Sequence, residues 1–261
     1  MSPAAKAAFQ PNWTRRAAWI GLALYCAYAF SILDVSYARF VRGLDQGGKF
    51  LARMFPPDME AQKLDLLWSG MVESLQIAVL ATFAGVILSL PIGLCAARNL
   101  MPAWVSWAAR GVIAVCRTFH PVIVAILFVK AVGFGALAGV LALVVSSIGF
   151  IAKLFAEAIE EMSLKQVEAV RATGASFMNV LVMGVFPQVM ARFIGFCAYQ
   201  LDSNLRNSTM VGIVGGGGIG AALFTAYQRF DYDFVLTILL AIIAVIMIGE
   251  VLSARMRAFF Q

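Results

Sequence analysis

The chain alternates long apolar runs with short polar segments, and the runs have the length of membrane-spanning helices. A helix rises about 1.5 Å per residue and the hydrocarbon layer is about 30 Å thick, so charge-free runs of roughly twenty residues are expected. Such runs occupy 17–33, 74–97, 131–152 and 234–249, and a more polar run occupies 187–206. This pattern predicts an all-α membrane protein.

A sixth apolar stretch, 103–132, is interrupted. It carries five polar or helix-breaking residues: Arg110, Arg117, His120, Pro121 and Lys130. Because proline lacks a backbone donor and biases its predecessor away from helix, we expect a break near His120 and Pro121. The stretch is either one broken crossing or a re-entrant segment. Counted as one crossing, it gives about six transmembrane helices.

Composition excludes several function classes. Apolar residues make up 62% of the chain and charged residues 13%, whereas soluble domains have about 45–50% and about 25%. The net charge of +6 comes from residues between apolar runs, which argues against a nucleic-acid-binding face. The four cysteines lie in apolar stretches with no close pair, and there is one histidine. We therefore expect no metal site and no disulfide framework.

Charge distribution predicts the topology, because Lys and Arg favour the cytoplasm and six spans put both termini on one side. With the N-terminus inside, nine such residues are internal: Lys6, Arg15, Arg16, Arg98, Lys153, Lys165, Arg171, Arg255 and Arg257. Six are external: Arg39, Arg42, Lys49, Arg53, Lys63 and Arg229. Both termini are therefore predicted to be cytoplasmic.

The predicted segments follow from this topology. They are a cytoplasmic N-terminus (1–16), a first transmembrane helix (17–33), an external loop (34–69), a membrane core (70–255) with a cytoplasmic connection (156–188), and a cytoplasmic C-terminus (256–261). Alternatively, the first apolar run is a signal peptide cleaved after a small-residue motif such as Ala27-Tyr28-Ala29. The run continues past that motif, which favours a span.

Two glycine motifs resemble nucleotide-binding loops. Gly43 to Lys49 matches GxxxxGK, but Phe50 replaces the Ser or Thr that would hold magnesium. Gly215 to Gly220 matches GxGxxG, but no acidic residue lies about twenty positions later. We interpret both matches as coincidental.

The cytoplasmic connection predicts a short amphipathic helix. Ser163 and Gln166 have capping-box spacing, and Leu164, Val167 and Val170 share one face. A left-handed C-terminal cap is expected at Gly174. Ser176 can cap the next helix, which runs from Phe177 until Pro187 and leads into the fifth span. The first helix either docks its apolar ridge into a partner's groove or lies flat on lipid headgroups.

The order Glu168-Ala169-Val170-Arg171-Ala172-Thr173-Gly174, with Pro187 thirteen positions later, resembles the EAA loop of binding-protein-dependent ABC importer permeases. The stretch from Asn204 to Gly220 resembles the glycine-rich signature of the phosphonate-type subfamily, as do 117–121 and 152–161. Departures from these patterns are Val170, Gly184, Phe186 and Gly216. The resemblance covers about 69–260.

The resemblance implies a type I ABC permease core with one extra N-terminal helix, in a bacterial inner membrane. It implies a second permease copy, two cytoplasmic ATP-binding subunits that hold ATP and magnesium, an external substrate-binding protein and surrounding lipids, without nucleic acid. This chain would not be an enzyme and would hold no cofactor; it would pass a small phosphorus oxyanion, a phosphonate or phosphite. The residues implied in ATPase coupling are Glu168, Ala169, Arg171, Gly174 and Pro187.

Polar residues within the spans are candidates for the substrate path or gate, because intramembrane charge persists only with a partner or a task. They are Arg117, His120, Asn204, Arg206, Asn207, Ser208, Thr209, Gly215, Gly216, Gly217 and Gly218. Asp202 lies four residues before Arg206 and can neutralise it, and Arg117 can be neutralised by a carbonyl or a neighbouring helix. The glycines are typical of a close-packed gate or a dimer contact.

Two other function classes compete. An ion-coupled secondary transporter of a small anion would need buried carboxylates and inverted repeats, and Asp202 alone is found. A membrane-embedded enzyme would need clustered carboxylates or histidines at one membrane face. Glu157, Glu160 and Glu161 form such a cluster, without metal-site spacing.

Overall fold

The computed structural model describes residues 13–33 and 36–260, without the side chains of 252, 253 and 256–260. Most of the predicted cytoplasmic segment 1–16 lies outside this range, so its placement is not tested. Over the described ranges the structure is helical and contains no strand. The chain divides into two units, 1–53 and 54–261.

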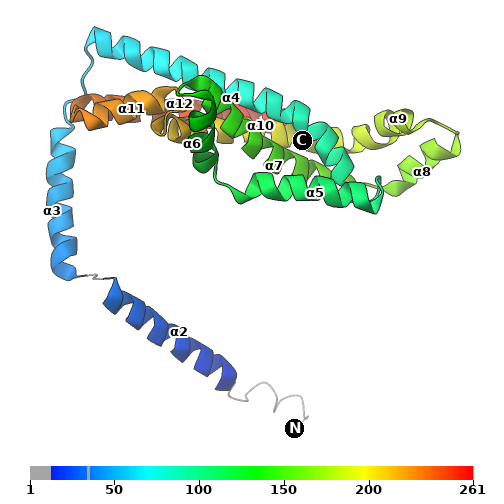
Figure 1. Ribbon diagram of the computed structural model, residues 1–261, viewed down its shortest axis with the longest axis horizontal. Helices are drawn as coiled ribbons and strands as arrows, with labels where there is room; N and C mark the ends of the chain where they lie inside the picture. The colour runs from blue at the N-terminus through cyan, green and yellow to red at the C-terminus, as the bar shows by residue number, and fades with distance from the viewer. Residues whose placement is uncertain (1–12, 34–35, 261) are drawn as a thin grey trace. The chain divides into compact units, whose positions relative to one another are not determined.

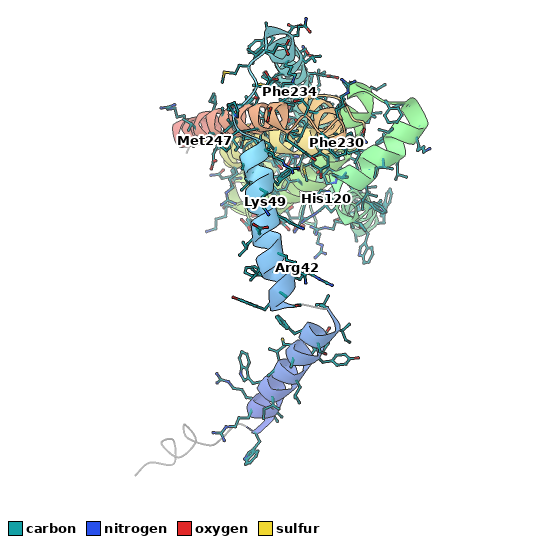
Figure 2. The ribbon with its side chains drawn as sticks, turned by 90° about the vertical axis from the view of Figure 1, so that its left-hand side faces the viewer. Arg42, Lys49, His120, Phe230, Phe234 and Met247 are labelled. Carbon is teal, nitrogen blue, oxygen red and sulfur yellow. The ribbon has the colours of Figure 1, made fainter. Side chains whose placement is uncertain are left out.

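The first unit contains two helices. Helix α2 (Trp13–Ile32) covers the predicted first span, and α3 (Tyr37–Arg53) follows it. The predicted loop 34–69 therefore contains a 17-residue helix and the beginning of the next one. Polar and apolar residues alternate with helical periodicity in α3, which carries Arg42 and Lys49 (Figure 2). The GxxxxGK match lies inside this helix, so it forms no phosphate-binding loop.

The second unit is a bundle of helices (Figure 1). Its elements are α4 (Ala61–Ala96), α5 (Ala103–Thr118), α6 (Pro121–Val132), α7 (Ala136–Glu160), α8 (Leu164–Ala172), α9 (Phe177–Val180), the π-helix η1 (Leu181–Val185), α10 (Phe186–Ile213), α11 (Ile219–Gln228) and α12 (Tyr232–Phe260). Among the described residues, four helices are long and apolar enough to cross a membrane: 61–96, 136–160, 177–213 and 232–251.

Two further pairs of helices qualify as spans only if each pair is counted together. Helices α5 and α6 are bent by 91° at 119–120, where the Pro121 rule predicts the break, and α2 and α3 form the other pair. The total of four to six agrees with the prediction of about six. The predicted span 131–152 instead begins at Ala136, because Gly133 and Gly135 have φ of +92° and +131° and separate α6 from α7.

Small residues bring α4 and α7 into the largest helix contact of this unit. A side chain at Gly85 would place its Cβ 2.4 Å from the Cβ of Ser147, and one at Gly93 would meet the Phe155 ring at 2.8 Å. Close approach through small residues is how membrane helices gain packing energy without a hydrophobic driving force. The α4–α7 pair thus forms the scaffold of the bundle.

An ionic cluster fastens the start of α4 to the α11–α12 turn. The Lys63 ammonium lies 2.6 Å from the Asp58 carboxylate and 2.7 Å from that of Asp231. Thr237 donates to the Asp58 carbonyl at 2.8 Å. The hydrogen bond from Lys63, with a further one from the Glu60 backbone, lowers the pKa of Asp58.

Candidate coupling site and substrate path

Helix α8 is mounted on the rest of the chain through its apolar ridge. Val167 is buried and Val170 half-buried against η1. A Cβ at Gly184 would lie 3.4 Å from the Cα of Val167, so this glycine lets the two helices approach. Only Leu164 of the ridge is exposed, at 44%. Most of the ridge thus packs inside this chain, and Leu164 is the part of it that is left for either a partner's groove or lipid headgroups.

The start of α8 is held by a residue distant in the sequence. The Ser163 N–H donates to Oε1 of Gln188 at 3.1 Å, and Nε2 of Gln188 donates to the Ser163 carbonyl at 3.2 Å and to the Gly184 carbonyl at 2.6 Å. The Ser163 side chain makes no capping bond. The predicted capping box with Gln166 is thus replaced by a clamp from α10, which ties α8 directly to a membrane span.

The turn after α8 and the next helix follow the prediction. Gly174 has φ of +75°, the left-handed conformation that favours glycine at a helix end. The helix from Phe177 leads into the fifth span, as predicted, and continues through η1 into α10 without a break at Pro187. Because Pro187 has no N–H and its ring would clash with the carbonyl four residues earlier, a wider π turn before it keeps the helix continuous.

The outward surface of α8 carries the residues of the EAA-like motif. Glu168, Ala169, Arg171 and Gly174 are exposed, and so is Pro187 at the first turn of α10. Within the described residues, neither Glu168 nor Arg171 forms an ion pair with another side chain. The motif therefore presents two available charges of opposite sign on a helix fixed at its other face.

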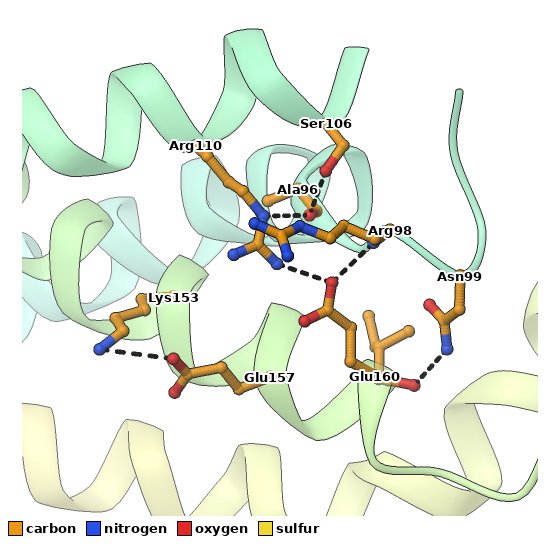
Figure 3. Close-up of polar contacts among 9 residues, drawn as sticks. Ala96, Arg98, Asn99, Ser106, Arg110, Lys153, Glu157 and Glu160 are labelled. Atoms are coloured by element: carbon orange, nitrogen blue, oxygen red, sulfur yellow. Dashed lines mark hydrogen bonds and ion pairs between the residues drawn. The ribbon is translucent and has the colours of Figure 1, made fainter. Parts of the chain in front are cut away.

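A polar network holds the helix ends beside this motif (Figure 3). The Glu160 carboxylate lies 2.6 Å from the Arg110 guanidinium and accepts from the Arg98 N–H at 2.8 Å. Asn99 donates to the Ile159 carbonyl at 2.7 Å. These bonds join the segment after α4, the middle of α5 and the end of α7.

The three glutamates considered as an enzyme site are all paired with cations. Glu157 pairs with Lys153 at 3.4 Å, Glu160 with Arg110, and Glu161 with Arg192 of α10 at 2.7 Å. No group of potential metal ligands occurs among the described residues. Each glutamate of the cluster therefore has a cationic neighbour in this structure.

Arg117 lies at the break between α5 and α6, between two cavities of about 310 and 390 Å³. Its stem packs on α7, where a Cβ at Gly149 would lie 2.8 Å from the arginine Cγ. The guanidinium has no ion-pair partner in the described part of the chain, so the predicted neutralisation by a neighbour is not found. His120 lines the second cavity, and its Nδ1 accepts weakly from the Val122 N–H at 3.4 Å, capping α6.

The polar residues of α10 separate into a buried and an exposed set. Asn204 is fully buried; its amide donates to Thr82 and Ser147 at 2.9 Å each, and its Oδ1 accepts from Gln200 at 3.0 Å. Ser208 is also fully buried and donates to the Leu205 carbonyl. In this conformation Asn204 therefore contacts α4 and α7, and Ser208 bonds within its own helix.

The remaining predicted residues of α10 lie on or near its open side. Arg206 contacts the Asp202 carboxylate, as the four-residue spacing predicts, and is 42% exposed. Asn207 donates to Ser203 at 3.3 Å and is half-buried, as is Thr209, whose carbonyl packs against Gly220. Ser203, Arg206 and Asn207 share one side of α10 with exposed Tyr199 and Met210, and these five residues form a stripe with three polar members in its middle.

Gly215, Gly216, Gly217 and Gly218 form a tight turn between α10 and α11. Each packs on a different neighbour: Phe134, Val211 with Gly139, Glu73 with Ala136, and Ser74, respectively. Ser74 accepts the Ile219 N–H at 2.8 Å, and the Gly215 carbonyl accepts from the Gly135 N–H at 3.0 Å. The close packing that glycine content predicts is thus made within this chain.

Sequence reasoning missed several residues that organise these sites. Glu73 and Ser74 sit against the glycine turn, and Gln188 clamps α8. Helix α11 was also not predicted, because the segment 215–233 was interpreted as a connection between two spans. A carboxylate at the edge of a charge-free run and an amide directly after Pro187 were the available signals.

Comparison with known proteins identifies the family. Residues 89–261 match the family described as the binding-protein-dependent transport system inner membrane component. The chain belongs to this family. The permease is 36% identical over 242 residues to the phosphite transport system permease protein PtxC of Stutzerimonas stutzeri, covering 92% of this chain and 86% of that protein.

A second relative is longer than this permease. Over 234 residues the chain is 37% identical to the phosphate-import permease protein PhnE of Mycolicibacterium smegmatis, covering 89% of this chain and 44% of that protein. Among solved structures, the methionine ABC transporter MetNI in an inward-facing conformation aligns with a TM-score of 0.69 at 22% identity, over 78% of this chain and 100% of that chain. The structural likeness establishes the type I permease fold.

Proposed function

We propose that this permease passes a small phosphorus oxyanion, a phosphonate or phosphite, across the bacterial inner membrane as part of an ATP-driven importer. Support for the substrate class comes from relatives named for phosphite and phosphate transport. Within the chain, Arg117 supplies a cation without an ion-pair partner beside two cavities. An anion entering a low-dielectric path needs such a charge, provided that it does not bind too tightly to leave.

The observation that carries the proposal is the exposed, rigidly mounted α8. Two ATP-binding subunits, which hold ATP and magnesium, would contact Glu168 and Arg171, and Gly174 permits the turn behind them. Gln188 ties the start of α8 to α10, and the Glu160 network joins α7 to α5, so a displacement of α8 would move these spans together. The result is alternating access, open outward and then inward.

A second permease copy would complete the path. Polar groups in the Tyr199–Met210 stripe are costly against lipid, so they are expected to face either another protein or an aqueous passage. We assign this stripe to the contact between two copies, with the passage between them. The external binding protein would deliver the anion on the other side from α8, and both termini of the permease would be cytoplasmic.

Purification of the complete complex in nanodiscs tests the substrate class. ATP hydrolysis would be measured with the binding protein and increasing phosphonate, phosphite, phosphate or methionine. Phosphonate or phosphite is expected to stimulate hydrolysis at the lowest concentration. Stimulation by methionine alone, or by none of the three phosphorus anions, would contradict the proposal.

Coupling is tested with Glu168→Lys and Gly174→Pro. Both should abolish uptake and weaken ATPase association, while the permease still inserts into the membrane. Gln166→Lys is the matched control, because it introduces the same lysine on roughly the opposite side of α8 and should leave uptake near the wild-type value. Normal uptake by Glu168→Lys would refute the contact.

The anion path is tested with Arg117→Gln. The variant should require at least tenfold more substrate for half-maximal uptake, since it loses the cation between the cavities. Lys130→Gln is the control, because it removes an exposed cation of α6 that lines neither cavity. An unchanged concentration curve for Arg117→Gln would remove Arg117 from the path.

A further inference from the structure

Helix α3 separates charge from apolar surface around its axis. At 100° per residue, its cations and acidic residue fall on one arc: Arg39, Arg42, Asp45, Lys49 and Arg53. The opposite arc carries large apolar side chains: Tyr37, Phe40, Val41, Leu44 and Leu51. All five are exposed, from 44% for Val41 to 83% for Tyr37. One side of the helix is thus apolar and exposed within this chain.

Helix α3 would be only marginally stable as an isolated helix in water. It has 17 residues, near the length at which isolated helices are marginal, and three of them are glycines. Each glycine costs about 1 kcal/mol relative to alanine in a helix interior. A Cβ at Gly43, Gly47 or Gly48 would meet nothing within 4 Å, so packing does not require these glycines. An external surface must therefore supply the stabilisation.

The connection of α3 to α2 brings a membrane surface to it. The charge-free stretch 17–33, all but its last residue within α2, is about 25 Å long. This is the short end of what crosses the hydrocarbon layer, so α2 can cross without α3. Helix α3 begins four residues after this stretch. With five charged residues in 17, α3 does not itself qualify as a span. Its N-terminal end is therefore held near one bilayer surface.

Charge selects the kind of lipid. Four cations face one acidic residue, Asp45, which already pairs with Lys49 at 2.6 Å. Low overall hydrophobicity, a basic polar arc and a Phe- and Leu-rich opposite arc are typical of helices that lie in the interfacial plane. We propose that α3 lies in the headgroup layer, with its apolar arc at the acyl boundary and its basic arc on the phosphates of anionic lipids. This inference is independent of the transported substrate.

Depth measurements test the orientation. In the full-length permease with its four cysteines replaced by alanine, spin labels would be attached at Leu44→Cys or Leu51→Cys, and at Gln46→Cys or Lys49→Cys as controls on the polar arc. In nanodiscs, the first pair should be accessible to oxygen, about 5–10 Å below the phosphates, and the second pair to a water-soluble nickel chelate. Equal accessibility of both pairs would overturn the proposal.

A lipid-composition arm tests the charge. A fluorophore at Leu44→Cys should be quenched several-fold more by brominated phosphatidylglycerol than by brominated phosphatidylcholine, since each nearby cation is worth about fivefold in attraction to an anionic surface. Combining Arg42→Gln with Arg53→Gln should bring the ratio close to one, whereas Gln46→Ala should leave it unchanged. Equal quenching in the parent protein would contradict the proposal. So would crosslinking of Phe40→Cys to a second permease copy or to the binding protein.

Discussion

Asn204 and Asn207 lie three positions apart on α10, and we expect the first to stabilise the fold and the second to take part in transport. Asn204 is fully buried and makes three side-chain hydrogen bonds to Thr82, Ser147 and Gln200. Asn207 is half-buried on the open stripe and makes one long bond to Ser203. We predict that Asn204→Leu destabilises the permease and that Asn207→Leu does not.

The size of the effect follows from the hydrogen bonds. Side-chain hydrogen bonds between membrane helices average about 0.6 kcal/mol, and a typical buried one contributes about 1 kcal/mol. Loss of three such bonds at Asn204 therefore costs about 2–3 kcal/mol, against about 0.5 kcal/mol or less at Asn207. For a chain of this size, the first value corresponds to a melting temperature lower by roughly 4–12 °C.

The assay is thermal unfolding of both variants in the same detergent, with uptake measured at a temperature where both are folded. Asn204→Leu should melt well below the parent protein. Asn207→Leu should melt within about 2 °C of it and lose transport instead. Equal melting temperatures for the two variants would refute the distinction between the buried and the exposed side of α10.

Three further predictions concern the ends of the bundle. Glu160→Gln should lower the free energy of unfolding by about 1–3 kcal/mol, because its charged contacts are partly buried. Glu157→Gln should lower it by about 0.5 kcal/mol or less, because its ion pair is more exposed. Equal effects of the two substitutions in chemical unfolding would contradict a stabilising role of the Glu160 network. Gly218→Val should prevent folding as judged by gel filtration, because Gly218 has φ of +74° and a Cβ there would lie 2.4 Å from the Ser74 hydroxyl. Gly111→Val should fold, because a Cβ at Gly111 would have no atom within 4 Å. The lowered pKa of Asp58 predicts a contribution to stability that is present above about pH 4 and is lost as the pH falls through the folded-state pKa. The melting temperature measured against pH should therefore lose this acid-sensitive step in Asp58→Asn. If the step remains, Asp58 is not its source.

Much of the architecture could be predicted because membrane helices are recognised in a sequence as long runs without charged residues. The long spans, the break before Pro121 and the left-handed Gly174 all follow from rules that act within a few residues. The contact of Asp202 with Arg206 also follows, since residues four apart share a helix face. Such local rules do not depend on the rest of the chain.

The errors concern which side of a helix faces a neighbour. Composition alone does not distinguish Asn204 from Asn207, and the difference arises only when α10 packs on α4 and α7. Likewise Gln188, 25 positions from Ser163, replaces the local cap expected from Gln166. Long-range contacts of this kind have no local sequence signal.

Helix α3 is a different kind of omission. Its periodicity was present in the sequence, but a search for charge-free runs passes over a segment with five charged residues. The amphipathic pattern would have been found by testing each connecting segment for helical spacing of Phe40, Leu44 and Leu51 as well as for length.

Uptake into proteoliposomes tests the central claim most directly, with the permease, the binding protein and a radiolabelled phosphonate present and ATP supplied on the side of α8. The account predicts accumulation only when the ATP-binding subunits are included, and its loss when the permease carries Glu168→Lys. Accumulation at the same rate without those subunits would contradict it.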